Sequence, residues 1–337
     1  MLSQRCSFAR ASLLLCLTTV LFNLTGCTKK PSEQKPVDLK LNVSVPFRFV
    51  AYGDTRFHDP NDTEAANPAV RLALVKAIAA ANPAFVCFTG DIVYNGFDVN
   101  DWKTWDSETS IWRDKKIPIY PALGNHDLHG GEKIALGNYF QRFPALNNSR
   151  YYSVRAANTL TLVLDSALAE TEGPQGQWLA SKLDKIPSDV DFVFLIFHHP
   201  PYTSSSDEKK FGGGHSARSP EQQLAKVLED RQPHARVRFV VFSGHVHNYE
   251  RHEHGGVTYF VTGGGGAHAY PIERAPGDPF QSKAVNYHYL LVDVDRGKMT
   301  VTMNRLDLTS GKETWTQPDS VAISVNTAAS AKAGSGN

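Results

Sequence analysis

Six short apolar segments, each followed at once by a polar loop, constrain the fold of this chain more than any other feature. They lie at residues 47–52, 85–88, 117–123, 160–164, 192–197 and 237–242. Apolar runs of this length, bounded by turn residues, are typical of buried strands. Between the first two, apolar residues recur at helical spacing from Val70 to Ala81, and Pro83 ends the pattern. Strands that alternate with helices predict an α/β core.

The pattern changes after residue 255, where strand-like segments follow one another without helices between them. These segments lie at residues 257–262, 287–294, 299–306 and 321–325. Consecutive strands favour antiparallel pairing, so we expect a second, partly antiparallel sheet. No internal repeat is visible, and no Pro-, Gly- or Ser-rich linker divides the region, which predicts one domain.

The first residues are typical of an exported protein. Arg5 and Arg10 precede an apolar stretch at residues 11–24, which is shorter than the ~20 residues of a membrane-spanning helix. Leu24-Thr25-Gly26-Cys27 then resembles the bacterial lipobox, in which the cysteine is acylated. We predict a lipoprotein signal at 1–26 and a lipid anchor on Cys27, facing the periplasm or the exterior; an ordinary signal peptide is the alternative.

Composition sets the other boundaries. Residues 27–44 are rich in Lys, Pro, Glu and Gln, which predicts a flexible tether, and residues 327–337 lack large apolar side chains, which predicts a disordered tail. The folded domain is therefore expected at 45–326. Lys and Arg total 35 against 34 for Asp and Glu, and no basic run occurs, so polymeric nucleic acid is not an expected partner.

Residues that bind metals gather in the loops that follow the predicted strands. These loops contain Gly53-Asp54, Gly90-Asp91, Gly124-Asn125-His126-Asp127, His198-His199 and Gly244-His245-Val246-His247. In open α/β sheets, ligands bind beyond the carboxyl ends of the strands, and glycine permits the sharp turn that a loop needs there. Each piece alone is a common turn, but five in order predict a metal site.

These ordered blocks resemble the calcineurin-like metallophosphoesterases. The segments Gly90-Asp91-Ile92-Val93-Tyr94, His198-His199-Pro200-Pro201-Tyr202 and Gly244 to Arg251 are most similar to the purple acid phosphatase branch. The resemblance implies a four-layer α/β/β/α sandwich, with two mixed β-sheets flanked by helices and the metal site in the loops after the strands. It also implies two metal ions and hydrolysis of phosphate esters.

Carried over by position, the resemblance assigns seven metal ligands. The first metal takes Asp54, Asp91, Tyr94 and His247, and the second takes Asp91, Asn125, His198 and His245. Asp54-Thr55-Arg56 departs from the family pattern, because arginine has no lone pair to donate where the broad superfamily has histidine. Tyr94 is the expected replacement ligand.

The charge of this ligand set bears on the identity of the metals. Two carboxylates and a Tyr94 phenolate carry three negative charges, which suits Fe(III) at the first site, beside a divalent Fe, Zn or Mn at the second. In the alternative interpretation, Tyr94 lines the pocket and two divalent ions bind.

Further residues near these blocks are candidates for contact with the substrate. His126 is expected to contact phosphate and protonate the leaving oxygen, or to bond a carboxylate, and Asp127 to orient it. Arg56 fits either phosphate or a salt bridge, and His215 is a candidate for facing the substrate. His199 is not expected to be a ligand, since adjacent strand residues point to opposite sides.

The leading functional hypothesis is an acid phosphatase that hydrolyses small phosphomonoesters through metal-bound hydroxide. A phosphodiesterase or nucleotide hydrolase is the enzymatic alternative, because the same bimetal site accepts diesters. A lipoprotein that binds metal or phosphate without turnover is the alternative from another class. The sequence indicates no protein partner.

Overall fold

The computed structural model describes residues 36–205 and 215–326, which all belong to the unit Lys35–Asn337. Within these residues, two seven-stranded mixed sheets form the centre of the fold. The predicted signal at 1–26 and the predicted tail at 327–337 lie outside the described residues. Among the helices of the described part, none is both long and apolar enough to span a bilayer.

The first sheet combines strands from both ends of this unit. Its order is β1 (Val37–Leu41), β5 (Tyr152–Ala156), β6 (Thr159–Val163), β7 (Phe192–Ile196), β8 (Arg238–Ser243), β10 (Val257–Thr262) and β9 (Tyr249–His254). The strands β6, β7, β8 and β10 run parallel, so their carboxyl ends meet at one edge.

The second sheet has a parallel half and an antiparallel half. Its order is β13 (Thr314–Thr316), β12 (Lys298–Asp307), β11 (Tyr287–Val294), β2 (Phe47–Tyr52), β3 (Val86–Phe88) and β4 (Ile119–Pro121), while β14 (Ser320–Ser324) pairs with β12. The strands β2, β3 and β4 are parallel, and β11 to β14 are antiparallel to their neighbours. Loops after β2, β3 and β4 therefore leave the sheet side by side.

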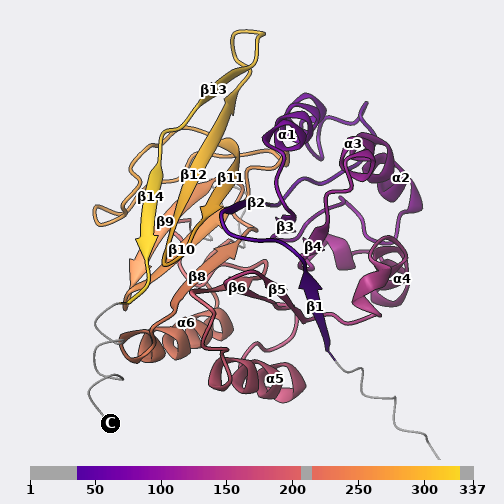
Figure 1. The fold of residues 1–337 in the computed structure, drawn as a ribbon. Helices are drawn as coiled ribbons and strands as arrows, with labels where there is room; N and C mark the ends of the chain where they lie inside the picture. The colour runs from indigo at the N-terminus through magenta and orange to yellow at the C-terminus, as the bar shows by residue number, and fades with distance from the viewer. Residues whose placement is uncertain (1–35, 206–214, 327–337) are drawn as a thin grey trace, which may run out of the picture. The chain divides into compact units, whose positions relative to one another are not determined.

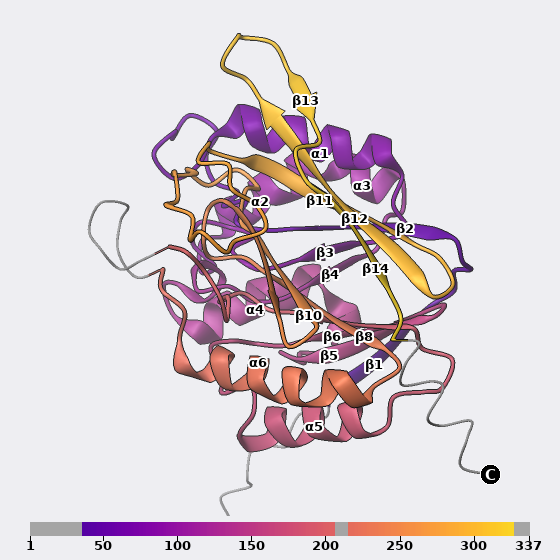
Figure 2. The same cartoon turned by 90° about the vertical axis from the view of Figure 1, so that its left-hand side faces the viewer.

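Helices cover the outer faces of the two sheets. The helices α5 (Gly173–Asp184) and α6 (Ser219–Arg231) pack on the first sheet, as Figure 2 shows. On the side of the second sheet lie α1 (Pro68–Ala81), α2 (Val99–Glu108), α3 (Ser110–Asp114) and α4 (Glu132–Arg142) (Figure 1). This arrangement confirms the predicted four-layer α/β/β/α class.

Side-chain alternation along the strands creates two separate cores. In β7, Phe194 faces the second sheet, whereas Val193 and Leu195 face α5 and α6. The ring of Phe194 lies 5.1 Å from that of Phe49 in β2, measured between centroids, and so joins the two sheets. Both faces of β7 are buried, which explains why its sequence reads as a continuous apolar run.

Two predictions about the organisation of the chain are wrong. Residues 37–41 lie inside the predicted tether of 27–44, yet they form β1, which pairs in parallel with β5. Alternating Val37, Leu39 and Leu41 supply the half-buried face that a strand requires. The expected second, partly antiparallel sheet is present, but β10 was wrongly placed in it: β10 joins the first sheet, while β11 to β14 extend the sheet that begins with β2.

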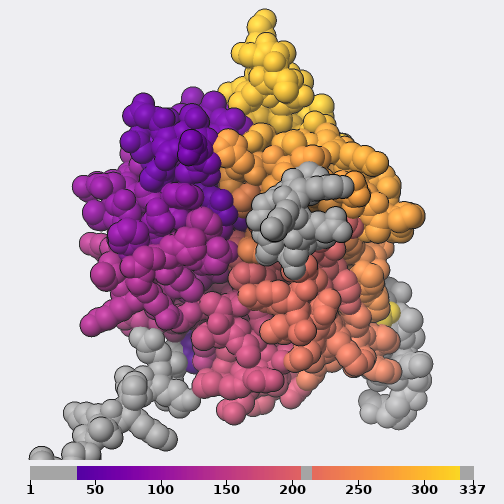
Figure 3. Space-filling model, turned by 180° about the vertical axis from the view of Figure 1, so that it is seen from behind, coloured from indigo at the N-terminus to yellow at the C-terminus, as the bar shows by residue number. Residues whose placement is uncertain are grey.

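In the space-filling view of Figure 3, the indigo-to-magenta surface of the earlier residues borders the orange surface of the later ones along one seam. The two sheets likewise mix early and late strands. Residues far apart in the sequence are therefore brought together where loops of the two sheets meet.

Candidate metal centre

Both sheets contribute side chains to one cluster of predicted ligands. The second sheet provides Asp54 after β2, Asp91 after β3 and Asn125 after β4; the first provides His198 after β7, and His245 and His247 after β8. The strands within each set are parallel neighbours, so their terminal loops lie side by side. Six of the seven predicted ligands thus converge at one place between the sheets.

The backbone of these loops adopts turns that disfavour most residues. Asp54, Asp91 and His245 have φ values of 56°, 53° and 70°, in the left-handed region. A Cβ on Gly124 would lie 2.3 Å from the backbone nitrogen of Asp91, which no real side chain permits. The glycines of the motif are therefore needed where loops approach one another closely.

Four ligand atoms surround the expected position of the second metal. His198 Nδ1 donates to the carbonyl of Thr89 at 2.9 Å, which leaves Nε2 as its ligand atom. This Nε2 lies 3.0 Å from Asn125 Oδ1, 3.2 Å from His245 Nδ1 and 3.4 Å from Asp91 Oδ1. A carboxylate, an amide oxygen and two imidazoles at such distances match a site for a borderline divalent ion.

The first metal position is defined by Asp54, Asp91 and His247, whose ligand atoms lie within 4.8 Å of one another. His247 Nδ1 donates to the carbonyl of His268 at 2.9 Å, so Nε2 holds the lone pair. Nε2 is buried, lies 3.6 Å from Asp54 Oδ1 and has no hydrogen-bond partner among the described residues. A buried nitrogen without a partner fits a metal ion as its missing partner.

The electrostatics of the cluster also fit cations. Burial, with a further contribution from Asp91, raises the pKa of Asp54 well above its usual range. Burial lowers the pKa of His198 and of His247, so both imidazoles are neutral near pH 7 and keep a lone pair for coordination. A pair of metal ions would compensate the two buried carboxylates, and the residues present therefore fit a dinuclear centre.

Tyr94, the seventh predicted ligand, lies between two histidines. Its ring centroid is 5.0 Å from that of His58 and 5.4 Å from that of His126. Its hydroxyl makes no hydrogen bond within the part of the chain that the structure describes. The phenol oxygen is thus not committed to another protein group, and coordination by Tyr94 stays a prediction.

Arg56 and His126 both contact Asp91, and their roles toward a substrate stay predictions. Arg56 Nη2 lies 3.5 Å from Asp91 Oδ2, and 17% of its side chain is exposed, so it pairs with the Asp91 carboxylate and keeps part of its side chain accessible. The backbone nitrogen of His126 donates to Asp91 Oδ1 at 2.9 Å. Burial lowers the pKa of His126 to about 4, which keeps its ring neutral.

The expectation that Asp127 orients His126 is wrong. Asp127 is fully buried and accepts hydrogen bonds from the backbone nitrogens of Ile92 and Gly124, both at 2.9 Å. The ring of His126 is instead held through Nδ1, 2.7 Å from the carbonyl of Tyr94. Asp127 therefore joins the loops that carry Asp91 and Asn125, and it does not touch the reacting groups.

His215 lies beside two of the predicted ligands, and its role toward a substrate stays a prediction. Its ring centroid is 4.9 Å from that of His245 and 5.8 Å from that of His247. Tyr270, which sequence reasoning missed, packs 5.3 Å from His215 and accepts a hydrogen bond from the backbone nitrogen of His247. In the sequence, Tyr270 could have been noticed because it follows the glycine run Gly263-Gly264-Gly265-Gly266.

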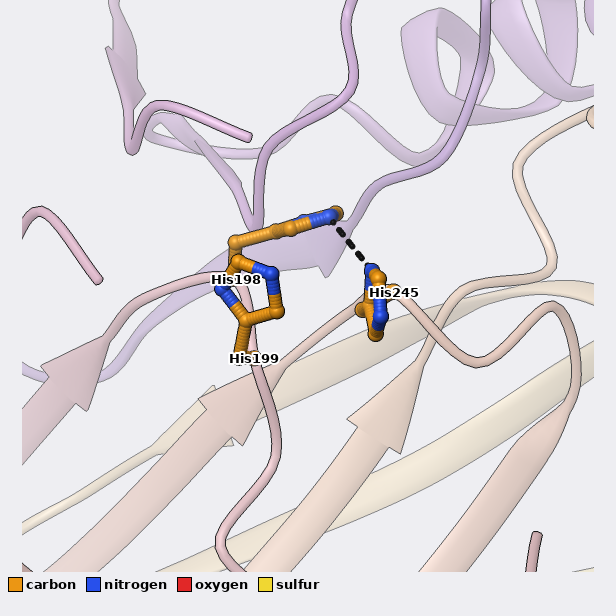
Figure 4. Close-up of side chains that lie close together, drawn as sticks. All are labelled: His198, His199 and His245. Carbon is orange, nitrogen blue, oxygen red and sulfur yellow. Dashed lines mark hydrogen bonds between the residues drawn. The ribbon is translucent and has the colours of Figure 1, made fainter. Parts of the chain in front are cut away.

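The argument that His199 points away from His198 is wrong. Both residues lie beyond the end of β7 at Ile196, where strand alternation no longer applies. Their ring centroids are 4.9 Å apart, and ligand atoms of His198, His199 and His245 lie within 4.8 Å of one another, as Figure 4 shows. His199 Nδ1 nevertheless lies 2.8 Å from Ser166 Oγ, so the side chain makes a buried hydrogen bond.

Comparison with known proteins identifies the same family that the sequence motifs resemble. The profile of the Calcineurin-like phosphoesterase family matches residues 47–249, more than half of the chain. Purple acid phosphatase 1 of Ipomoea batatas is 28% identical over 228 residues, which cover 62% of this chain and 44% of that protein. Phosphoenolpyruvate phosphatase of Allium cepa is 27% identical over 203 residues, or 56% of this chain and 40% of that protein. The chain thus spans less than half the length of these curated relatives.

Among solved structures, the purple acid phosphatase from seeds of yellow lupin, Lupinus luteus, has a similar fold. The TM-score is 0.64 at 18% sequence identity, over 84% of this chain and 54% of that one. At this identity the likeness concerns the fold, and it agrees with the two mixed sheets flanked by helices.

Proposed function

Because this chain belongs to the calcineurin-like phosphoesterase family, we propose that it is a dinuclear metal-dependent hydrolase of phosphate esters. The observation that carries the proposal is the convergence of Asp54, Asp91, Asn125, His198, His245 and His247 from two sheets. No fold requirement explains a cluster of two buried carboxylates and three imidazoles, whereas metal binding does.

When bound, two metal ions polarise the phosphoryl oxygens and lower the pKa of water. The chain's own residues then orient and neutralise the substrate. Arg56 offers guanidinium donors at the pocket side of Asp91, a geometry suited to a phosphoryl oxygen. His126 donates its Nδ1–H to the carbonyl of Tyr94, so Nε2 holds the lone pair of the neutral ring; Nε2 would supply a proton to the leaving oxygen only when the ring is protonated, which its lowered pKa confines to acidic solution.

We infer that the substrates are small phosphomonoesters and that the enzyme is of the acid phosphatase type. The names of the two curated relatives, a purple acid phosphatase and a phosphoenolpyruvate phosphatase, support monoesters. Paired assays on nitrophenyl phosphate and bis-nitrophenyl phosphate would test this choice. Faster cleavage of the diester would favour a phosphodiesterase.

Removal of a predicted ligand tests the activity itself. We expect Asn125→Ala and His198→Ala each to lower kcat at least a hundredfold, because both side chains converge on the second metal position. His234→Ala, an exposed histidine at the end of the 3₁₀ turn Gln232–His234, is the matched control and should retain full turnover. Full turnover in both site variants, or no turnover in the metal-loaded wild type, would contradict the proposal; the second result would favour a non-catalytic binding protein.

We further propose Fe(III) at the Asp54, Asp91, Tyr94 and His247 position, with divalent Fe, Zn or Mn at the other. A phenolate adds a third negative charge to the two carboxylates and favours a trivalent ion, and the Tyr94 hydroxyl is not engaged elsewhere among the described residues. Metal analysis with a visible spectrum tests this. A tyrosinate band that disappears in Tyr94→Phe supports it, and a colourless protein with two divalent ions contradicts it.

We also propose that Cys27 carries a lipid that anchors the protein to a bacterial membrane, facing the periplasm or the exterior. The lipobox-like Leu24-Thr25-Gly26-Cys27 supports this proposal, since several acyl chains on one cysteine give stable anchoring. Metabolic labelling with an alkyne fatty acid should mark the wild type but not Cys27→Ser. Equal labelling of both, or of neither, would contradict the anchor.

A further inference from the structure

His199 is the one histidine at the metal cluster to which the family resemblance assigns no role. It is 8% exposed, and its ring centroid lies 4.4 Å from that of His245 and 4.9 Å from that of His198 (Figure 4). The four ligand atoms at the second metal position come from other residues. A histidine in this place, not needed for coordination, is available to the substrate.

Ser166 is the hydrogen-bond partner of His199 at Nδ1. Ser166 Oγ accepts a hydrogen bond from the backbone nitrogen of His199 at 3.3 Å and lies 2.8 Å from its Nδ1. A hydroxyl has one proton to give, and among the described residues Nδ1 is the acceptor within reach. This hydrogen bond fits either tautomer, and the one in which Ser166 donates to Nδ1 places the ring proton on Nε2.

Ser166 is itself held in place by a charged pair. Arg218 Nη2 donates to the carbonyl of Ser166 at 2.7 Å, and the same guanidinium pairs with the buried carboxylate of Glu221 at the start of α6. The contact fixes the backbone of Ser166, and through it the ring of His199. A side chain that binds a substrate atom must be held in one orientation, and contacts of this kind provide that support.

The Nε2 atom of His199 has no hydrogen-bond partner within residues 36–205 and 215–326. The atom is not fully enclosed either, since no atom of His199 is among the fully buried polar atoms that lack a partner. We propose that His199 is a further substrate-binding residue, whose Nε2–H donates to a phosphoryl oxygen of the ester beside the second metal. This inference rests on the proposed function for the identity of its ligand.

Inorganic phosphate binding to the metal-loaded protein, measured by titration calorimetry, tests the proposal without requiring turnover. His199→Phe keeps a ring but removes the donor, and it should raise the Kd for phosphate about ten- to a hundredfold, the effect of one hydrogen bond to a charged group. His199→Gln restores an N–H near the position of Nε2 and should recover part of the affinity. Ser166→Ala should weaken binding less than His199→Phe does.

Metal content, measured on the same samples, separates this role from coordination. We expect two metal ions per chain in the wild type and in every variant, and unchanged phosphate affinity in the control His234→Phe. Three results would each overturn the proposal. These are wild-type phosphate affinity in His199→Phe, loss of a metal ion in that variant, and absence of phosphate binding in the wild type. A wild type that binds phosphate but hydrolyses no ester would contradict the proposed function and leave the His199 contact supported.

Discussion

Glu170 is a fully buried carboxyl group whose two oxygens meet no hydrogen-bond donor among the described residues. It lies in the loop between β6 and α5, and Glu221 of α6 is the acidic side chain that acts on it. Burial, followed by the charge of Glu221, raises the pKa of Glu170 to about 8. In the native protein, Glu170 therefore holds a proton that the unfolded chain loses near its ordinary pKa of 4.5.

This difference makes the free energy of unfolding depend on pH. Between pH 4.5 and 8 the native state binds more protons at Glu170 than the unfolded state, so stability falls as pH rises through this window. Glu170→Gln cannot ionise, and its amide can donate to Glu221. We expect the variant to lose up to about 1.4 kcal/mol per pH unit of that slope. Denaturant unfolding at pH 5, 6.5 and 8 measures it.

The free energy of unfolding of Glu170→Gln, relative to that of the wild type, should rise steadily from pH 5 to pH 8. Glu172→Gln, at an exposed position in the same segment, is the matched control and should follow the wild type. Parallel pH profiles for Glu170→Gln and the wild type would show that this proton is not retained on folding.

Single residues also show what the sequence could predict about the site. Asp54, Asp91 and His247 follow strands and carry an ordered motif, so their convergence could be predicted. The role of Asp127 could not, because it depends on which backbone nitrogens the folded loops present to its carboxylate. His199 was misjudged for a local reason: β7 ends three residues earlier, and alternation was carried past its end.

At the scale of elements, glycine marks the loops that must approach closely. A Cβ on Gly124 would lie 2.3 Å from Asp91 Oδ1, and one on Gly137 in α4 would meet nothing within 4 Å. We expect Gly124→Ala to lose metal and to unfold at lower temperature, because the loops after β3 and β4 must separate. Gly137→Ala should stabilise the protein by about 0.5–1 kcal/mol, since alanine restricts the unfolded chain and favours helix.

Calorimetric melting with metal analysis of both variants checks this pair. Both variants replace glycine with alanine, so they differ only in the surroundings of the substituted residue. Normal metal content in Gly124→Ala would show that the close approach of the loops does not require glycine. A lower melting temperature in Gly137→Ala would show that alanine is not favoured at this position of the helix.

Helices and strands with a strong local sequence pattern could be predicted, and those with a weak pattern could not. The strand β2 and the helix α1 follow period-2 or helical patterns, and the sequence predicted them within two residues. The strand β1 was missed because charged neighbours hid its alternation, and the place of β10 depended on pairing with a strand fifteen or more residues away. Pairing partners are chosen by the whole sheet, and a segment's own residues do not reveal them.

At the scale of the whole molecule, the metal centre joins the two sheets. One sheet provides Asp54, Asp91 and Asn125, and the other provides the three histidines. The sheets also meet in the apolar core, in which the ring of Phe49 packs against Phe194, and through hydrogen bonds such as that from the backbone nitrogen of Gly53 to the carbonyl of Thr262 at 3.1 Å. A metal ion that binds only the native arrangement therefore acts as a cross-link between layers, and its binding free energy adds to the stability of the fold.

Removal of the metals should therefore destabilise the entire unit. A free metal concentration one hundred times the Kd contributes about 2.7 kcal/mol, so chelation should lower the melting temperature and raise hydrogen exchange in the loops after β2, β3, β7 and β8. His247→Ala, which lacks one ligand, should show a smaller chelator effect than the wild type, whereas His234→Ala should show the full effect. If the chelated protein melts at the wild-type temperature with unchanged exchange, the metal ions do not contribute to holding the sheets together. A centre built from both sheets predicts the opposite, because two buried carboxylates then face each other without a cation.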